Sequence, residues 1–202
     1  MTIAYTLSIH NDDSYMLGPE TYFPLKPKGF HHWRFGTDGV PHPATCAACG
    51  RKTDPTYINP HFRVKKRKRD LTMTYDGYAL VSTRFRDFCE LHSWTGAVFV
   101  PLPADKNFFV FRLSDVLTFD SERRETRFGK RCSVCDAHYE VTGAYPAYLR
   151  GIKEPIKEGF FRSDLEFAAG PEQSPIIILG IDTAMTIKAQ KFKLCDLEAV
   201  PA

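Results

Sequence analysis

Two short cysteine motifs constrain the fold of this chain more than any other feature. The first is Cys46-Ala-Ala-Cys49 and the second is Cys132-Ser-Val-Cys135. A CxxC motif on a tight turn presents two thiolates on one side, and two such turns can surround a metal ion tetrahedrally. The sequence therefore predicts one structural Zn²⁺ ion held by Cys46, Cys49, Cys132 and Cys135.

The residues next to the two motifs fit turns of this kind. Gly50 follows the first motif, where a turn requires a positive φ. Asp136 has the corresponding place after the second motif, and aspartate tolerates that backbone conformation better than most residues. Lys130 and Arg131 precede the second motif and could offset the net charge that four thiolates leave on a zinc ion.

Other roles for the cysteines stay open. A redox CxxC motif usually lies where a strand meets a helix, and neither motif follows a convincing strand. Disulfide or unpaired cysteines are the remaining alternative. His42 and His138 lie near the motifs, either as hydrogen-bonding partners or substitute ligands of the site, or as ordinary surface residues of a turn. Cys89 and Cys195 fall in apolar patterns, which predict buried packing.

The spacing of the motifs determines the expected domain organisation. Residues 50–131, 82 residues in all, separate the two motifs. We expect a single domain, 1–202, with a zinc element from 41–51 and 130–140, an inserted subdomain at 52–129 and a C-terminal strand-helix-strand unit at 175–200. Closing so long a loop costs entropy, so the metal would contribute to holding both parts in register.

Apolar patterns predict two units with the same order of elements. In residues 78–102, a strand precedes Ser82 as helix N-cap, apolar positions follow at 85, 88, 89 and 92, and a strand resumes at 97–102. In residues 176–200, a strand precedes Asp182 as N-cap, a helix at 183–190 and a strand at 192–200. This repetition indicates either a diverged duplication or two independent units of a common kind.

Weaker patterns complete the predicted secondary structure. Strands are expected at 3–9 and 107–113, with weaker signals at 22–25 and within 57–74. The predicted fold class is α+β, with mixed sheets, short helices, two strand-helix-strand units and a zinc-ribbon-like element of four cysteines.

Charge is concentrated in one segment. The chain has 27 Lys and Arg against 24 Asp and Glu, but without six clustered cations the balance is 21 against 24. These six cations form the basic run: Arg63, Lys65, Lys66, Arg67, Lys68 and Arg69. Such a run can contact a phosphate backbone, with Tyr57, Phe62 and Tyr75 available to stack on bases, or it can protect a solvated edge strand. A nucleic-acid-binding zinc-ribbon protein is therefore the alternative function, with weak, non-specific binding expected.

Several classes of protein find no support in the sequence. The longest apolar run, residues 176–179, is far shorter than the about 20 residues that span a bilayer, and the N-terminus does not resemble a secretory signal. We therefore expect a cytoplasmic protein without membrane partners. The common nucleophile, phosphate-binding and metalloprotease motifs are absent from the sequence, and four cysteine ligands leave a zinc ion no open position, so a non-enzymatic role is expected.

The order of these parts resembles the double-CxxCG-motif family. It comprises CxxCG at 46–50, a long insert with a strand-helix-strand unit, the second CxxC, Phe160-Phe-Arg-Ser-Asp164 and a final strand-helix-strand unit. Asp136 stands where the family has glycine. The resemblance implies a bacterial, zinc-stabilised immunity protein that binds and neutralises a cognate toxin.

Partner contacts of such a protein would favour aromatic and arginine side chains on or beside the two units. Packing or an ordinary surface position is the alternative role for each. The candidates for partner contact are His31, His32, Trp33, Trp94 and Arg162.

Overall fold

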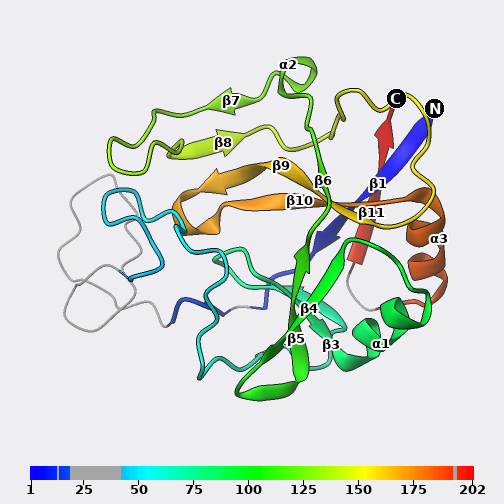
Figure 1. Ribbon diagram of the computed structural model, residues 1–202, viewed down its shortest axis with the longest axis horizontal. Helices are drawn as coiled ribbons and strands as arrows, with labels where there is room; N and C mark the ends of the chain where they lie inside the picture. Colours follow the sequence, from blue (N-terminus) through cyan, green and yellow to red (C-terminus); the bar gives the residue numbers. More distant parts are fainter. Residues whose placement is uncertain (13, 19–41, 193–194) are drawn as a thin grey trace.

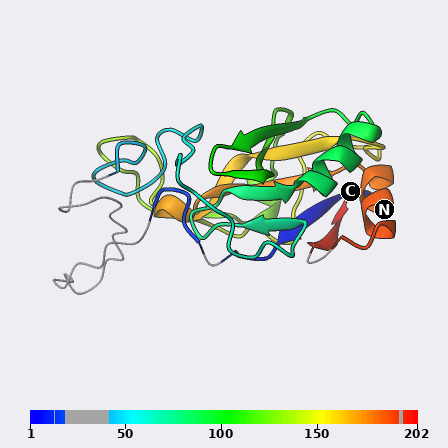
Figure 2. The ribbon, with the colours of Figure 1, turned by 90° about the horizontal axis from the view of Figure 1, so that it is seen from below.

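The computed structural model describes residues 1–12, 14–18, 42–192 and 195–202. Within these residues the chain forms two β-sheets that lie one over the other, as the two views in Figures 1 and 2 show. The expected strand at 22–25 and the candidate contact residues His31, His32 and Trp33 lie outside the described residues.

The larger sheet has the strand order β11-β1-β10-β9-β8-β7, and β6 pairs with β9 in parallel beside this path. The other neighbours are antiparallel. The strands are β1 (Thr2–Ile9), β6 (Val116–Leu117), β7 (Arg127–Phe128), β8 (Glu140–Thr142), β9 (Phe160–Ala169), β10 (Ser174–Leu179) and β11 (Cys195–Pro201).

The smaller sheet is antiparallel, with the order β2-β3-β5-β4. Its strands are β2 (Leu71–Met73), β3 (Ala79–Ser82), β4 (Ala97–Leu102) and β5 (Asp105–Leu113). The helices are α1 (Thr83–Leu91), α2 (Ser121–Arg124) and α3 (Ile181–Ala189), with a 3₁₀ turn, η2, at Gly170–Glu172. Mixed sheets with a few short helices agree with the predicted α+β class, and no described helix is long and apolar enough to cross a membrane.

The two strand-helix-strand units are present as β3-α1-β4 and β10-α3-β11. In each unit, a third strand lies between the outer two and is antiparallel to both: β5 in the first and β1 in the second. The outer strands of each unit are therefore parallel to each other, which is the arrangement of a split βαβ motif. Both helices have nine residues, and both lie at the same end of the molecule (Figure 1).

The two helix starts differ in how well the sequence predicted them. Ser82 is the N-cap of α1, as expected, and its Oγ accepts a hydrogen bond from the Phe85 backbone N–H at 3.3 Å. Asp182 as N-cap of α3 was wrong, because Gly180 has that position and Asp182 lies in the first turn. A Cβ at Gly180 would lie 2.5 Å from the Glu158 backbone nitrogen, so close packing of two backbones selects glycine there.

Both sheets bury apolar side chains on two faces, with alternate residues pointing in opposite directions. In β3, Ala79 and Val81 join the core between the sheets, while Leu80 faces a second cluster outside the smaller sheet. In β10, residues 177 and 179 face the same central core, and residues 176 and 178 face a third cluster on the other side of the larger sheet. Burial on both faces explains the continuous apolar run at 176–179.

Phe160 of β9 lies at the centre of the core between the sheets and is fully buried. Its ring centroid is 5.3 Å from that of Phe111 on β5 and 5.7 Å from that of Trp94, which precedes β4. Gly96 also contacts this position, because a Cβ built on it would lie 1.9 Å from the Phe160 carbonyl oxygen. The backbone of the first unit therefore touches the backbone of the larger sheet at Gly96.

We predict that Gly96→Ala destabilises the protein by about 3 kcal/mol or more, because the added methyl group meets the Phe160 carbonyl and φ is positive at this residue. Gly151→Ala is the matched control, since φ is +79° there against +81° at Gly96 and no heavy atom lies within 4 Å of the new Cβ. The control variant should lose only the about 1–2 kcal/mol of a left-handed non-glycine residue. Denaturant unfolding of both variants measures the difference, and equal losses would contradict the close backbone contact.

Candidate metal centre

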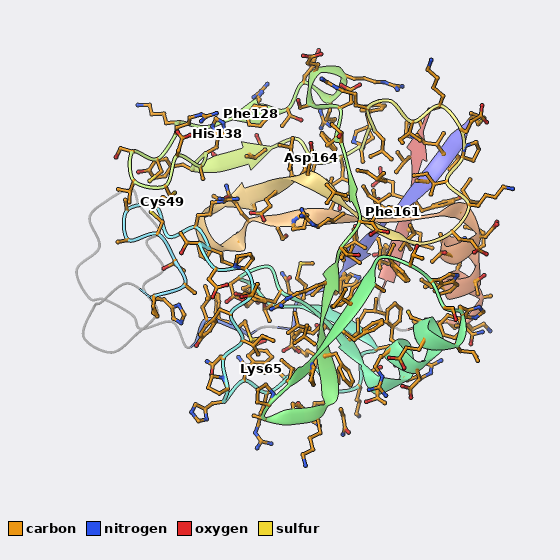
Figure 3. All side chains as sticks on the ribbon, in the orientation of Figure 1. Cys49, Lys65, Phe128, His138, Phe161 and Asp164 are labelled. Carbon is orange, nitrogen blue, oxygen red and sulfur yellow. The ribbon has the colours of Figure 1, made fainter. Side chains whose placement is uncertain are left out.

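The four cysteines of the two CxxC motifs lie together at the end of the molecule opposite α1 and α3, where Figure 3 labels Cys49. Their sulfur atoms all lie within 4.8 Å of one another. The Sγ atoms of Cys46 and Cys132 are 3.9 Å apart, and those of Cys49 and Cys135 are 3.6 Å apart. A metal–sulfur bond of about 2.3 Å in a tetrahedron requires sulfur atoms about 3.8 Å apart. The four thiols therefore fit one tetrahedral metal ion.

The two turns that carry the cysteines have the same backbone hydrogen bonds. In the first turn, the Cys46 N–H donates to the Arg51 carbonyl and the Gly50 N–H donates to the Cys46 carbonyl. In the second turn, the Cys132 N–H donates to the carbonyl of residue 137 and the Asp136 N–H donates to the Cys132 carbonyl. Isolated β-bridges close both turns, between residues 45 and 52 and between residues 131 and 138.

The residue after the second cysteine has a positive φ in both turns, +74° at Gly50 and +57° at Asp136. This agrees with the predicted equivalence of the two positions. The Asp136 carboxylate also binds Arg131 Nη1 at 2.6 Å, an exposed ion pair across the base of the second turn. Arg131 therefore pairs with Asp136, and Lys130 is exposed.

The thiols of the cluster differ in how readily they lose a proton. Backbone N–H groups of Cys135 and Val134 point at Cys132 Sγ and lower the pKa of that thiol to about 6. Burial raises the pKa of Cys49 to about 12 and also raises the pKa of Cys135. A bound cation would reverse the effect of burial, because it stabilises the thiolate form of every ligand. A metal ion would therefore favour all four thiolates, including those of Cys49 and Cys135, whose pKa burial raises.

Neither nearby histidine belongs to the group of metal-ligating atoms. His42 is buried, its Nδ1 accepts a hydrogen bond from the Ala44 N–H at 3.0 Å, and its ring lies edge-on to Tyr57. His138 Nδ1 lies 2.7 Å from the Gly129 carbonyl oxygen, and its ring contacts Phe128. Both histidines therefore support the turns rather than add a fifth ligand.

Lys52 attaches the first turn to the two sheets, a role that sequence analysis missed. Its Nζ donates to the carbonyl oxygens of Asp76, Pro171 and Gln173 at 2.5, 2.6 and 2.7 Å. Burial lowers the pKa of Lys52 to about 8. Arg51 adds an ion pair with Glu166 of β9 at 2.8 Å. An isolated lysine in a loop carries no pattern that predicts such a position.

The basic run forms an irregular loop beside the smaller sheet, where Figure 3 labels Lys65. The strand expected within 57–74 is β2, which begins after the run, so the run itself does not form an edge strand. Two buried aspartates shape the loop: Asp12 accepts the backbone N–H groups of Lys65 and Lys66, and Asp105 pairs with Arg67. These contacts hold the chain in turns that a strand does not permit.

The other predicted residues lie apart from the cysteines. Trp94 is half-buried against Phe88 and Phe160. Arg162 is half-buried on β9, facing the space between the sheets. Cys89 is buried in α1 within the central core, as expected, and burial raises the pKa of its thiol. Cys195 belongs to β11, but its side chain lies outside what the structure describes.

Comparisons with protein-family models, with curated proteins and with solved structures found no match in any of the three.

We predict that protein purified without added metal carries about one metal ion per chain, measured by elemental analysis. Cys46→Ser and Cys132→Ser, one from each turn, should lose most of that metal and melt at a lower temperature, because each removes a ligand from a four-ligand site. Cys89→Ser is the control and should keep the metal. An unmodified protein without metal, whose four thiols all react with a thiol reagent, would contradict the site.

Proposed function

We propose that this chain is a non-enzymatic, zinc-stabilised protein-binding module, and that it is an immunity protein that neutralises a cognate bacterial toxin in the cytoplasm. The observation that carries the metal part of this proposal is the placement of four sulfur atoms within 4.8 Å by two matching turns. The partner part rests on the resemblance of the motif order to the double-CxxCG-motif family.

Zinc is the metal that this donor set favours. Four thiolates in a tetrahedron suit Zn²⁺, and thiolate ligands disfavour magnesium, calcium and manganese. The two turns form a zinc-ribbon-like element, since each contributes one CxxC pair from a bridged hairpin. Four cysteine ligands would leave the ion no position for water, so its role would be structural. Thiols of this kind persist in a reducing compartment, which is why we propose a cytoplasmic location.

A structural zinc ion suits an inhibitor of another protein. An inhibitor needs a surface held in one shape before binding, because ordering it at the time of binding lowers affinity. The second turn and the adjacent strand β7 expose two apolar side chains, Val134 at 68% and Phe128 at 43%. Zinc would hold these side chains in place through Cys132 and Cys135. Trp94 and Arg162 remain candidates for partner contacts.

We predict that co-expression of this protein with the product of the gene immediately upstream restores growth that the upstream product alone prevents, and that the two proteins purify as a complex. Cys46→Ser should lose the protection, because the first turn and the surface next to it loosen without zinc. Cys89→Ser, which keeps all four ligands, should still protect. If the purified protein neither binds the upstream product nor protects against it, the immunity function is wrong.

Binding of nucleic acid through the basic run is a second candidate function. Five of its six residues have exposed side chains, and the run adjoins Arg84 around the start of α1. Arg67 is paired with Asp105, and Arg69 Nη1 donates to the Asn11 carbonyl oxygen at 2.6 Å. Arg67 and Arg69 therefore already have partners within the protein, and this favours weak and non-specific binding of nucleic acid.

We predict that affinity for double-stranded DNA is weak and falls steeply with salt. Changing Lys65, Lys66 and Lys68 to Gln should flatten the plot of log K against log [salt] by up to about 3 units of slope, because each phosphate contact contributes about 0.9. Changing the exposed Lys153, Lys157 and Lys188 to Gln removes the same charge elsewhere and should leave the slope nearly unchanged. Sequence-selective binding at physiological salt would make nucleic-acid binding the leading function.

A further inference from the structure

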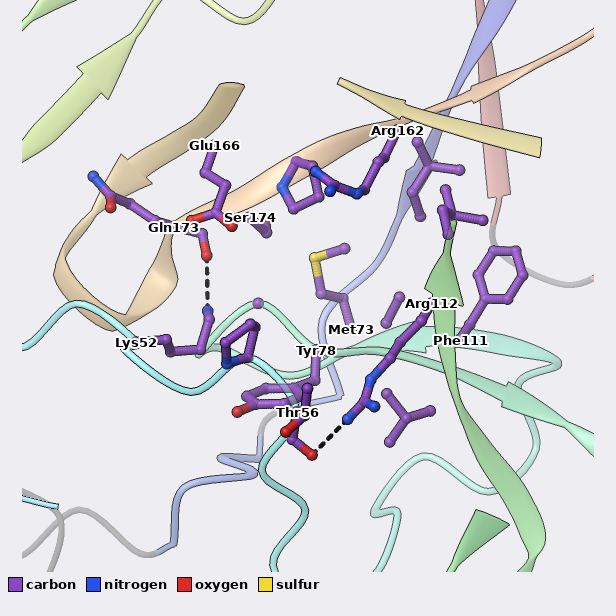
Figure 4. A pocket seen from close by; sticks show the side chains of 17 residues that line it. Lys52, Thr56, Met73, Tyr78, Phe111, Arg112, Arg162, Glu166, Gln173 and Ser174 are labelled. Carbon is purple, nitrogen blue, oxygen red and sulfur yellow. Dashed lines mark hydrogen bonds between the residues drawn. The ribbon is translucent and has the colours of Figure 1, made fainter. Parts of the chain in front are cut away.

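A cavity of about 270 Å³ lies between the two sheets, and we call it the inter-sheet cavity (Figure 4). Strands β2, β3 and β5 line it from the smaller sheet, and β9 and β10 line it from the larger one. Its apolar wall continues the central core and includes Met73, Phe111, Leu113 and Ile177. The cavity wall can therefore pack against the apolar part of a small-molecule ligand.

Two arginines line the same cavity, and on one of them, Arg112, the carboxylate of Asp54 acts electrostatically without an ion pair. Arg112 of β5 donates through Nη2 to the Thr56 carbonyl oxygen at 2.7 Å, and its Nε is buried with no acceptor. Arg162 of β9 donates through Nη1 to the Ser163 carbonyl oxygen at 3.3 Å. Among the residues that the structure describes, neither guanidinium forms an ion pair with a carboxylate.

The charges that line the cavity do not balance. Glu166 is the one acidic residue of the described lining, and Arg51 already binds its carboxylate at 2.8 Å. The ammonium of Lys52 is held by three carbonyl oxygens, which are neutral. Two buried polar atoms of lining residues, Arg112 Nε and the Tyr78 hydroxyl oxygen, have no hydrogen-bond partner among the described residues. Such atoms, together with two half-buried guanidinium groups, are costly unless a bound group compensates them.

An irregularity in β9 positions one of these arginines. Arg162 lies opposite Ile177 and Glu166 lies opposite Pro175, so three residues of β9 face a single residue of β10. Ser163 secures this bulge: its Oγ accepts from the Ile176 N–H at 2.9 Å and donates to the Leu165 carbonyl at 2.6 Å. Bulges of this kind direct side chains beside binding sites. In the segment 160–164, Arg162 thus contributes a side chain to the cavity, and the next residue, Ser163, fixes the backbone that carries it.

We propose that the inter-sheet cavity binds a small amphipathic acid, with its carboxylate held by Arg112 or Arg162 and its apolar body against Met73, Phe111 and Ile177. A carboxylate accepts two parallel hydrogen bonds from one guanidinium, and it would supply the acceptor that Arg112 Nε lacks. The apolar wall distinguishes such a ligand from a bare anion. This binding site is separate from the four cysteines.

Calorimetric titration of the metal-loaded protein with octanoate and with phenylacetate tests the proposal and separates an aliphatic from an aromatic acid. We expect at least one acid to bind, and its neutral amide to bind ten- to a hundredfold more weakly, because the charge-assisted hydrogen bonds are lost. Inorganic phosphate, which has the charge but no apolar body, should also bind at least tenfold more weakly. An amide or phosphate that binds as tightly as the acid would overturn the proposal, as would no binding of either acid at millimolar concentration.

Matched variants locate the site. Arg112→Gln and Arg162→Gln should lower the affinity for the acid, at least one of them by tenfold or more. Neither should change the affinity for the amide. Arg127→Gln, which removes an exposed arginine on β7, should change neither. If a glutamine variant fails to fold, Arg162→Lys keeps the charge but loses the forked geometry, and its affinity for the acid should be lower than that of the unmodified protein. Equal affinity in all variants would place the acid elsewhere and overturn the proposal.

Discussion

The aromatic core between the two sheets is the interaction on which the remaining structure depends. Phe160 of the larger sheet meets Phe111 of the smaller sheet and Phe85 of α1, with ring centroids 5.3 and 6.4 Å apart. Phe192 then joins the region after α3 to the same cluster through Phe85, at 5.1 Å. Because Phe85 belongs to the first strand-helix-strand unit and Phe192 to the second, burying these rings together fixes how one unit lies on the other. The loops, the cysteines and the cavity all take their positions from that arrangement.

This core changes the expected role of the metal. From the sequence alone, the 82 residues between the two motifs lead us to expect that the metal contributes to closing a long loop. In the structure, the ends of the insert are also joined by the core, by the three hydrogen bonds of Lys52 and by the pairing of β6 with β9. These contacts close the loop together with the thiolates. A metal ion held by the four cysteines would therefore act mainly on the shape of the two turns and of the surface beside them.

The parts that the sequence predicted well are those in which local residues determine local structure. The CxxC spacing and the residues Gly50 and Asp136 define each cysteine turn within about eight residues, and Ser82 marks the start of α1. Long-range strand pairing could not be predicted from the sequence. No local pattern predicts that β1 becomes the middle strand of the second unit, or that β9 is ten residues long. The sequence left open whether the basic run lies on an edge strand, and it forms a loop because Asp12 and Asp105, which are distant in sequence, impose turns on it. The cavity arginines lie in separate strands, so only the fold brings them together.

The first cysteine turn and the inter-sheet cavity are connected by a short stretch of chain. Residues 52–56 follow the turn directly, and they supply Lys52 and Thr56 to the wall of the cavity. Lys52 holds this stretch to the turn between β2 and β3 and to η2, and the Thr56 carbonyl receives the hydrogen bond from Arg112. Thus the position of Arg112 depends on a loop whose other end is fixed by Cys46 and Cys49. If a metal ion is bound there, its removal would loosen that end, and Arg112 would then lose a neutral acceptor and one wall of the cavity.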